Sequence, residues 1–124
     1  MNKNFRDLTK KEKEILDFLL KDNFPGRDDL LKQLEFAKVR LIKEYSDNWG
    51  SLEFLVETNL TAKVQERIPV QATSYDIDGV PIQIFLHVVE GKINELEVVK
   101  ADNSPIINPI DLSNTHIDSV TIQV

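Results

Sequence analysis

Residues 80–100, VPIQIFLHVVEGKINELEVVK, are the stretch that decides the fold of this chain. Two runs rich in Val, Ile, Leu and Phe flank the dipeptide Glu90-Gly91, and glycine accepts the positive φ angles that tight turns require. The stretch therefore predicts a β-hairpin around which the other elements are arranged.

The alternation of apolar and polar residues discriminates between two registers for this hairpin. A two-residue loop would pair Val89 with Lys92 and set glutamates opposite apolar residues, whereas a three-residue loop would pair Val88 with Lys92 and keep apolar residues together, with Gly91 at a bulge. Because a one-residue slip exchanges the two faces of a strand, we predict the second register. Its inner face would hold Val80, Ile82, Ile84, Leu86, Leu96 and Val98. Its opposite face would hold Gln83, Phe85, His87, Ile93, Glu95, Glu97 and Val99, a mixed surface that is either covered by helices or used by a partner.

Two helices are predicted before the hairpin. Thr9 and Glu12 fit a capping box, in which the Thr9 hydroxyl accepts from the third helical amide and Glu12 reaches back to the cap. A helix over residues 9–21 follows, and Pro25 and Gly26 separate it from a shorter helix over residues 27–34. The apolar side of the first helix is Ile15, Leu16, Phe18, Leu19 and Leu20, and the buried edge of the second is Leu30, Leu31 and Leu34.

From Ala37 onward the apolar period changes from about 3.6 to about 2 residues, which indicates strands. Besides the central hairpin, strands are predicted over residues 39–45, 51–57, 64–75 and 116–124, with the first two paired as a hairpin. Pro69 has no backbone donor and is expected to interrupt the third of them or to mark an edge. The connections are too short for parallel crossovers, so the pairing should be mostly antiparallel.

Together these elements predict a single α+β domain over residues 1–124, with two N-terminal helices packed on a mostly antiparallel five- or six-stranded sheet. The length of 124 residues and the 41% hydrophobic content suit one domain with one core. No apolar run reaches the roughly 18 residues of a membrane span, and the N-terminus lacks the apolar stretch of a secretory signal. Cysteine is absent, which excludes disulfides and thiol chemistry, and we expect a cytoplasmic protein.

The net charge of −6 is distributed unevenly. Residues 1–43 hold 11 Lys and Arg against 8 Asp and Glu, whereas residues 44–124 hold 4 basic against 13 acidic residues. The acidity therefore lies in the half of the chain that holds most of the predicted sheet. Such a field repels nucleic acid and attracts basic proteins, although an acidic surface also serves solubility alone.

Side chains that support catalysis are few. His87 and His116 are the only histidines, and no phosphate-binding or metalloprotease motif occurs. Glu95 and Glu97 share one face of a predicted strand and resemble an acid–base pair, but alternating glutamates are common on solvated strands. We therefore predict no catalytic residue, no cofactor and no enzymatic activity.

Two further patterns have structural explanations. Asp76, Asp78 and Gly79 resemble the start of a calcium loop, but the later ligands are missing and a hairpin turn accounts for them, so no metal site is predicted. Lysines 10, 11, 13 and 21 gather near the first helix. Acidic residues alternate with these lysines, which indicates a solvated helix face and no nucleic-acid partner.

Two stretches of the chain resemble a small bacterial family. They are LTKKEKEILDFLLKDNFPGRDDLLKQL at residues 8–34 and RIPVQATSYDIDGVPIQIFLHVVEGKINELEVVKADNSPI at residues 67–106, with the motifs FPGRD, DGVPI, LHVV-GK and ELE in order. The family has no established enzymatic activity and includes immunity proteins that are encoded beside the toxins of contact-dependent growth inhibition systems. The resemblance implies a toxin inhibitor without chemistry of its own, and it carries over no site residues.

The charge distribution fits that role, because toxins that cut nucleic acid are usually basic around their active sites and attract an acidic inhibitor. We therefore predict an immunity protein that neutralises a cognate contact-dependent growth inhibition toxin, a basic nuclease domain, by stoichiometric protein–protein interaction. The predicted contact residues are Asp76, Asp78, Glu95, Glu97 and Asp102, with Glu44, Asp47 and Trp49 as a second group.

Two alternatives stay open at this point. One is an enzyme that uses Glu95, Glu97 or His87. The other is a small-ligand or housekeeping interaction module, in which apolar cargo would bind around Phe85, Ile93 and Val99 on the mixed face of the hairpin.

Overall fold

The structure, a computed structural model, describes residues 4–46, 49–64 and 66–120. The helices are α1 (Lys10–Leu19) and α2 (Arg27–Gln33), and the short 3-10 helices are η1 (Leu34–Phe36) and η2 (Leu112–Asn114). The strands are β1 (Ala37–Ser46), β2 (Trp49–Val56), β3 (Val70–Tyr75), β4 (Pro81–Val89), β5 (Lys92–Lys100) and β6 (Thr115–Val120). Within the described ranges, neither helix has the length and apolar character needed to cross a membrane.

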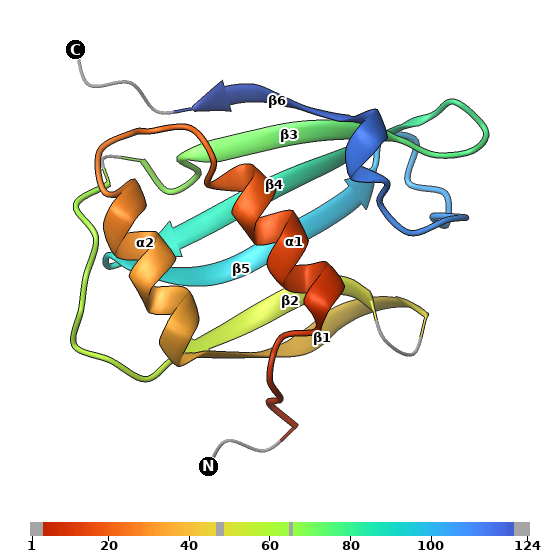
Figure 1. Cartoon of the computed structure of the whole chain (residues 1–124). Helices are drawn as coiled ribbons and strands as arrows, with labels where there is room; N and C mark the ends of the chain where they lie inside the picture. Colours follow the sequence, from red (N-terminus) through yellow and green to blue (C-terminus); the bar gives the residue numbers. More distant parts are fainter. Residues whose placement is uncertain (1–3, 47–48, 65, 121–124) are drawn as a thin grey trace.

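The six strands form one sheet in the order β1-β2-β5-β4-β3-β6, and every pairing is antiparallel. Both α-helices lie on the same face of this sheet (Figure 1). We call the face under the helices the inner face and the other the outer face. The predicted α+β class, with two N-terminal helices on an antiparallel sheet, is confirmed, and the strand number is six.

Helix α1 begins at the predicted capping box. The Thr9 hydroxyl accepts from the Glu12 amide at 3.1 Å, and the Thr9 amide donates to Glu12 Oε1 at 2.9 Å. Arg6 adds a two-pronged ion pair to the same carboxylate, at 2.8 and 2.9 Å. Burial alone would raise the pKa of Glu12, but the bonds from Arg6 and Thr9 hold it below its usual value. The carboxylate therefore stays ionised at the helix start and fixes the preceding segment against the helix.

The central hairpin forms where it was predicted, but its turn is different. Glu90 and Gly91 have φ angles of 52° and 78°, so a two-residue turn joins the strands and Val89 pairs with Lys92. The predicted three-residue loop is wrong. The chain then leaves Asn94 unpaired in a β-bulge, which shifts the register of the remaining pairs by one residue.

The bulge restores the predicted separation of the two faces. Ile84 pairs with Val98 and Leu86 pairs with Leu96, so apolar residues meet across the strands. The predicted inner residues Ile82, Ile84, Leu86, Leu96 and Val98 are all buried, whereas Val80 precedes β4 and is half-buried. Ile93, which was predicted on the opposite face, belongs to the core. It therefore cannot line an apolar cargo site on the outer face.

The other predicted elements form with different ends, most of them by one or two residues. The predicted strand 64–75 begins only at Val70, because Pro69 offers no amide hydrogen to the ladder. Helix α1 ends two residues before its predicted limit. The last strand is described to Val120, and the rest of its predicted range lies outside the described residues.

A buried glutamine joins α2 to the central hairpin. Gln33 is 0% exposed, and its amide nitrogen donates to the carbonyls of Leu60 and Gly91, at 3.2 and 2.7 Å. Its side-chain oxygen accepts from the Ile93 amide at 3.0 Å. The predicted buried edge of α2 named leucines only, and of these Leu30 alone is fully buried.

Replacing this glutamine tests how strongly it holds the helix on the sheet. We expect Gln33→Met, which keeps the length but removes all three hydrogen bonds, to lower the free energy of unfolding by about 2 kcal/mol. Urea denaturation measures the change, with the exposed neighbour change Lys32→Met as the matched control. Equal stability of the two variants would show that water replaces the lost bonds without cost.

Candidate functional site

The end of β1, the start of β2, the β3–β4 connection and the segment 101–111 after β5 come together at one end of the sheet, which we call the loop end. Their proximity follows from the antiparallel order, since β1, β5 and β3 all run toward this end. In Figure 1 the loop end lies on the right.

A buried ion cluster organises the loop end. The Lys100 ammonium group donates to Asp76 Oδ2 at 2.9 Å and to Asp78 Oδ2 at 2.6 Å. The side chains of Lys100 and Asp76 are 1% and 0% exposed, whereas that of Asp78 is 38% exposed. The ammonium group therefore lies between the two carboxylates that resembled the start of a calcium loop.

The Asp76 carboxylate also binds three backbone amides. It accepts from Ile77 at 2.8 Å within the β3–β4 turn, and from Ile107 and Asn108 at 2.7 and 3.1 Å in the segment after β5. Burial by itself would raise the pKa of Asp76, but the bonds from Ile107, Lys100, Ile77 and Asn108 hold it far below its usual value. One ionised side chain thus joins two connections that are distant in the sequence.

Two isoleucines protrude beside this cluster. Ile77 is 73% exposed and Ile107 is 57% exposed, although each donates its backbone amide to the buried Asp76. Here both side chains face solvent from a backbone whose amides are bonded to a buried carboxylate.

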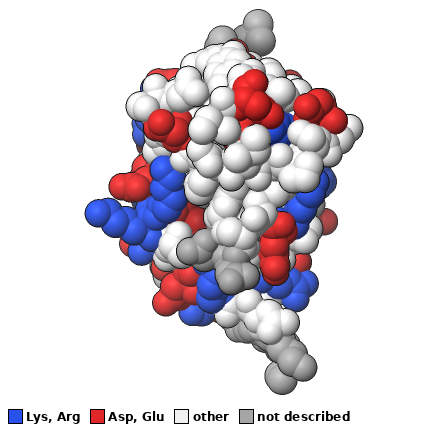
Figure 2. All heavy atoms as spheres, turned by 90° about the vertical axis from the view of Figure 1, so that its right-hand side faces the viewer, with Lys and Arg blue, Asp and Glu red and all other residues white. Residues whose placement is uncertain are grey.

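Carboxylates accompany these isoleucines. Asp78 is half-exposed, and Asp102 is exposed and accepts from the amide and hydroxyl of Ser104 at 3.0 and 2.6 Å. Glu44 is exposed near the end of β1. Figure 2 shows this end of the molecule, where uncharged surface runs down the middle, acidic groups lie near its upper part, and acidic and basic groups alternate along both flanks.

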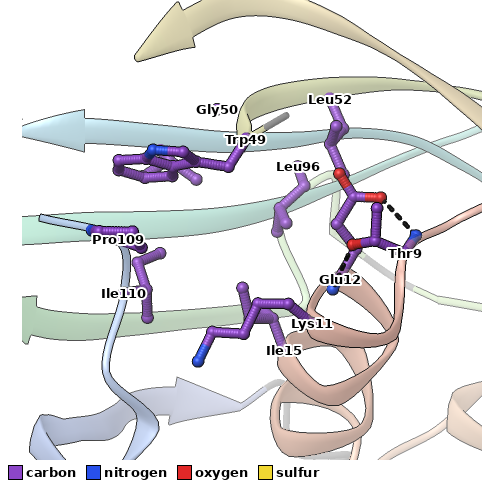
Figure 3. Close-up of a pocket in the computed structure, with 11 residues that line it drawn as sticks. Thr9, Lys11, Glu12, Ile15, Trp49, Gly50, Leu52, Leu96, Pro109 and Ile110 are labelled. Carbon is purple, nitrogen blue, oxygen red and sulfur yellow. Dashed lines mark hydrogen bonds between the residues drawn. The ribbon is translucent and has the colours of Figure 1, made fainter. Parts of the chain in front are cut away.

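An apolar pocket also opens at the loop end, between α1, the sheet and the segment after β5 (Figure 3). Its volume is about 260 Å³. It is lined by Thr9, Lys11, Glu12, Ile15, Trp49, Gly50, Leu52, Leu96, Val98, Pro109 and Ile110. Trp49 stacks at a tilt on Tyr45, with 5.0 Å between ring centroids, and the Tyr45 hydroxyl donates to the Val98 carbonyl at 2.7 Å. The half-buried Trp49 side chain thus lines the pocket while its ring packs against Tyr45.

The loop end unites most of the residues predicted to bind a partner. Asp78, Asp102, Glu44 and Trp49 all belong to it. Asp76 lies there too, but it is buried and bonded internally, so it supports the surface without contributing to it. Asp47 lies outside the described residues.

Glu95 and Glu97 lie elsewhere, on the outer face in the middle of the sheet. Glu97 Oε1 is 2.8 Å from His87 Nε2, and Glu95 lies directly opposite His87 and opposite Glu53 of β2. The structure thus separates these two glutamates from the aspartates with which they were grouped.

The spacing of His87, Glu95 and Glu97 would suit a metal ion, since their ligand atoms lie within 4.8 Å of one another. However, Arg67 Nε donates to His87 Nδ1 at 3.0 Å. Because a guanidinium group can only donate, Nδ1 accepts and Nε2 carries the hydrogen that faces Glu97. Both ring nitrogens are thereby engaged, and the arrangement favours a hydrogen-bonded Arg–His–Glu chain over a metal centre.

Sequence reasoning did not identify Lys100, Ile77 or Ile107 as parts of a site. Lys100 continues the alternation of the buried residues Leu96 and Val98, so its inward position could have been inferred. An inward lysine next to a turn with two aspartates is a signal for a buried ion cluster.

Comparison with known families gives one match. The model of a family described as a domain of unknown function, DUF6984, matches residues 5–110, which include both helices, the first five strands and most of the loop end. No curated protein and no solved structure matches the chain. The family description names no activity, so the immunity function stays a prediction. The matched residues cover most of the sequence, and the chain therefore belongs to the DUF6984 family.

Proposed function

We propose that this protein is an immunity protein, a stoichiometric inhibitor that binds the toxin of a contact-dependent growth inhibition system in the cytoplasm. The toxin would be a basic nuclease domain. The inhibitor covers a surface of that domain through its loop end and carries out no reaction itself.

The observation that carries this proposal is the pair of exposed isoleucines on a buried ionic base. Ile77 and Ile107 are fixed through their backbone amides to Asp76, so little conformational freedom is lost there when a partner binds. Apolar anchors surrounded by polar groups are the usual energetic centre of protein interfaces. Asp78 and Asp102 beside them supply charges that pair with lysine or arginine of a basic partner.

The charge of residues 44–124 supports the same kind of partner. Residues 44–124 carry 13 acidic against 4 basic residues. A field of this sign attracts a basic protein over a distance and speeds association at low salt. An inhibitor that must capture a toxin soon after its delivery benefits from that speed.

Replacing Glu95 and Glu97 on the outer face tests whether they attract the toxin at long range or contact it directly. We expect the double change Glu95→Lys, Glu97→Lys to slow association with the toxin about three- to tenfold at low salt, because it removes two negative charges and adds two positive ones in the acidic part of the chain. Dissociation should not change, since these residues lie away from the loop end. Stopped-flow or surface-based kinetics measure both rates.

The matched control is Gln83→Glu, which adds a negative charge to the same face and should speed association slightly. Thermal unfolding of the double variant checks that loss of the His87–Glu97 bond leaves the fold intact. A dissociation rate raised by about thirtyfold or more would contradict the proposed interface and place the toxin on the outer face.

A further inference from the structure

The pocket behind Trp49 has the construction of a small-molecule site. Three separate parts of the chain enclose it: α1 through Ile15, the sheet through Leu52 and Leu96, and the segment after β5 through Ile110. In Figure 3 these side chains surround a common space, with the Trp49 ring and Pro109 on one side and α1 on the other. The space therefore lies between packed elements and not in a flexible loop.

The polar groups at its wall are already bonded to the protein. The Glu12 carboxylate receives hydrogen bonds from Arg6 and from the Thr9 amide, and the Thr9 hydroxyl receives one from the Glu12 amide. The remaining side chains of the lining are apolar apart from Lys11. An apolar group entering the pocket would thus displace water without breaking any of these bonds.

Of the two charged side chains that line the pocket, Glu12 is bonded within the protein, and Lys11 is left to pair with a ligand. It is exposed, and within the described parts of the chain its ammonium group has no ion pair or hydrogen bond. Its charge interacts with Asp111 only at longer range. Figure 3 shows its side chain running from α1 along the edge of the pocket toward the side of Ile110.

The volume limits the size of the ligand. A cavity of about 150 Å³ holds benzene, so the 260 Å³ found here suits roughly ten non-hydrogen atoms. We propose that this pocket binds a small apolar monocarboxylate of about that size, with its hydrocarbon part against Trp49 and Ile15 and its carboxylate paired with Lys11. Such binding does not depend on the toxin-binding role, because the surface around Ile77 and Ile107 and the pocket beside Lys11 are different parts of the loop end.

The test uses 3-phenylpropionate and octanoate as probes on the full chain. Trp49 is the only tryptophan, so its fluorescence reports on the pocket directly, and amide resonances of Lys11, Gly50 and Ile110 give an independent readout. We expect saturable changes in both signals, with a dissociation constant of about 1 mM or lower for at least one probe.

Variants and a neutral analogue decide whether the carboxylate matters. Lys11→Gln should weaken binding of the probe about fivefold, and 3-phenylpropanol, which lacks the charge, should bind correspondingly more weakly to the unchanged protein. Lys13→Gln, an exposed change on the same helix outside the lining, should have no effect. Absence of any saturable response to either probe overturns the proposal, as does equal affinity for the acid and the alcohol together with no effect of Lys11→Gln.

Discussion

Replacing Asp76 by asparagine should lower the free energy of unfolding by about 3 kcal/mol, because the change leaves the buried Lys100 ammonium with a single, half-exposed carboxylate partner. Asparagine has nearly the same shape, so the loss reports on charge and hydrogen bonding more than on packing. Asparagine keeps only one side-chain oxygen, so either the amide of Ile107 or that of Asn108 loses its acceptor. Urea denaturation at pH 7 measures the effect.

Asp102→Asn is the control, since this aspartate is exposed and bonds only within its own turn. It should be far less destabilising than Asp76→Asn. Similar losses for the two variants would mean that the ion cluster does not hold the loop end together.

The pH dependence of stability follows from the same carboxylate. The pKa of Asp76 is lower in the folded chain than its ordinary value of 3.8, so the unfolded chain takes up the proton first as the pH falls. The stabilisation by ionised Asp76 is therefore complete above about pH 5 and is lost progressively below about pH 4. The difference in unfolding free energy between the unchanged protein and Asp76→Asn should accordingly be largest at neutral pH and shrink in acid.

The double change Ile77→Lys, Ile107→Lys should weaken toxin binding by at least about thirtyfold, mainly through faster dissociation, because it removes two apolar anchors and adds charges that repel a basic partner. Both side chains are more than half exposed, so the fold should be unaffected. Isothermal titration calorimetry gives the affinity and the stoichiometry, and circular dichroism confirms the fold.

Phe36→Lys is the matched control for this variant. Phe36 is 51% exposed and lies in η1 before β1, at the opposite end of the sheet from the loop end. It should bind the toxin with unchanged affinity. If Phe36→Lys weakens binding and the isoleucine variant does not, the interface lies at the other end of the molecule.

The fold could be predicted from the sequence because its strongest signals are local. Alternation over residues 80–100 identified the buried face of the central hairpin, and the Thr9–Glu12 spacing identified the start of α1. The exact register could not be obtained in this way. The two-residue turn pairs Val89 with Lys92, one residue away from the predicted register, and the bulge at Asn94 shifts the pairing by one further residue. Neither of the registers that we compared combined a two-residue turn with a bulge.

The candidate site was harder to predict because its parts come from distant segments. The turn aspartates and Trp49 were predicted as contact residues, but their geometry depends on Lys100 and on the segment after β5, which meet them only in the folded sheet. The grouping of Glu95 with the aspartates failed for the same reason. Glu95 and the aspartates are close in the sequence, but Glu95 lies on the outer face within the strands, whereas the aspartates lie at the loop end.

The most direct test of the central claim is to isolate the tagged protein from its own cells, beside the Ile77→Lys, Ile107→Lys variant, and to titrate any captured partner. The account predicts one basic protein bound in a one-to-one ratio, with a nuclease activity that the unchanged protein abolishes at equimolar amounts and the variant does not. A partner that is retained equally by the variant, or whose activity is unaffected by saturating inhibitor, would contradict it.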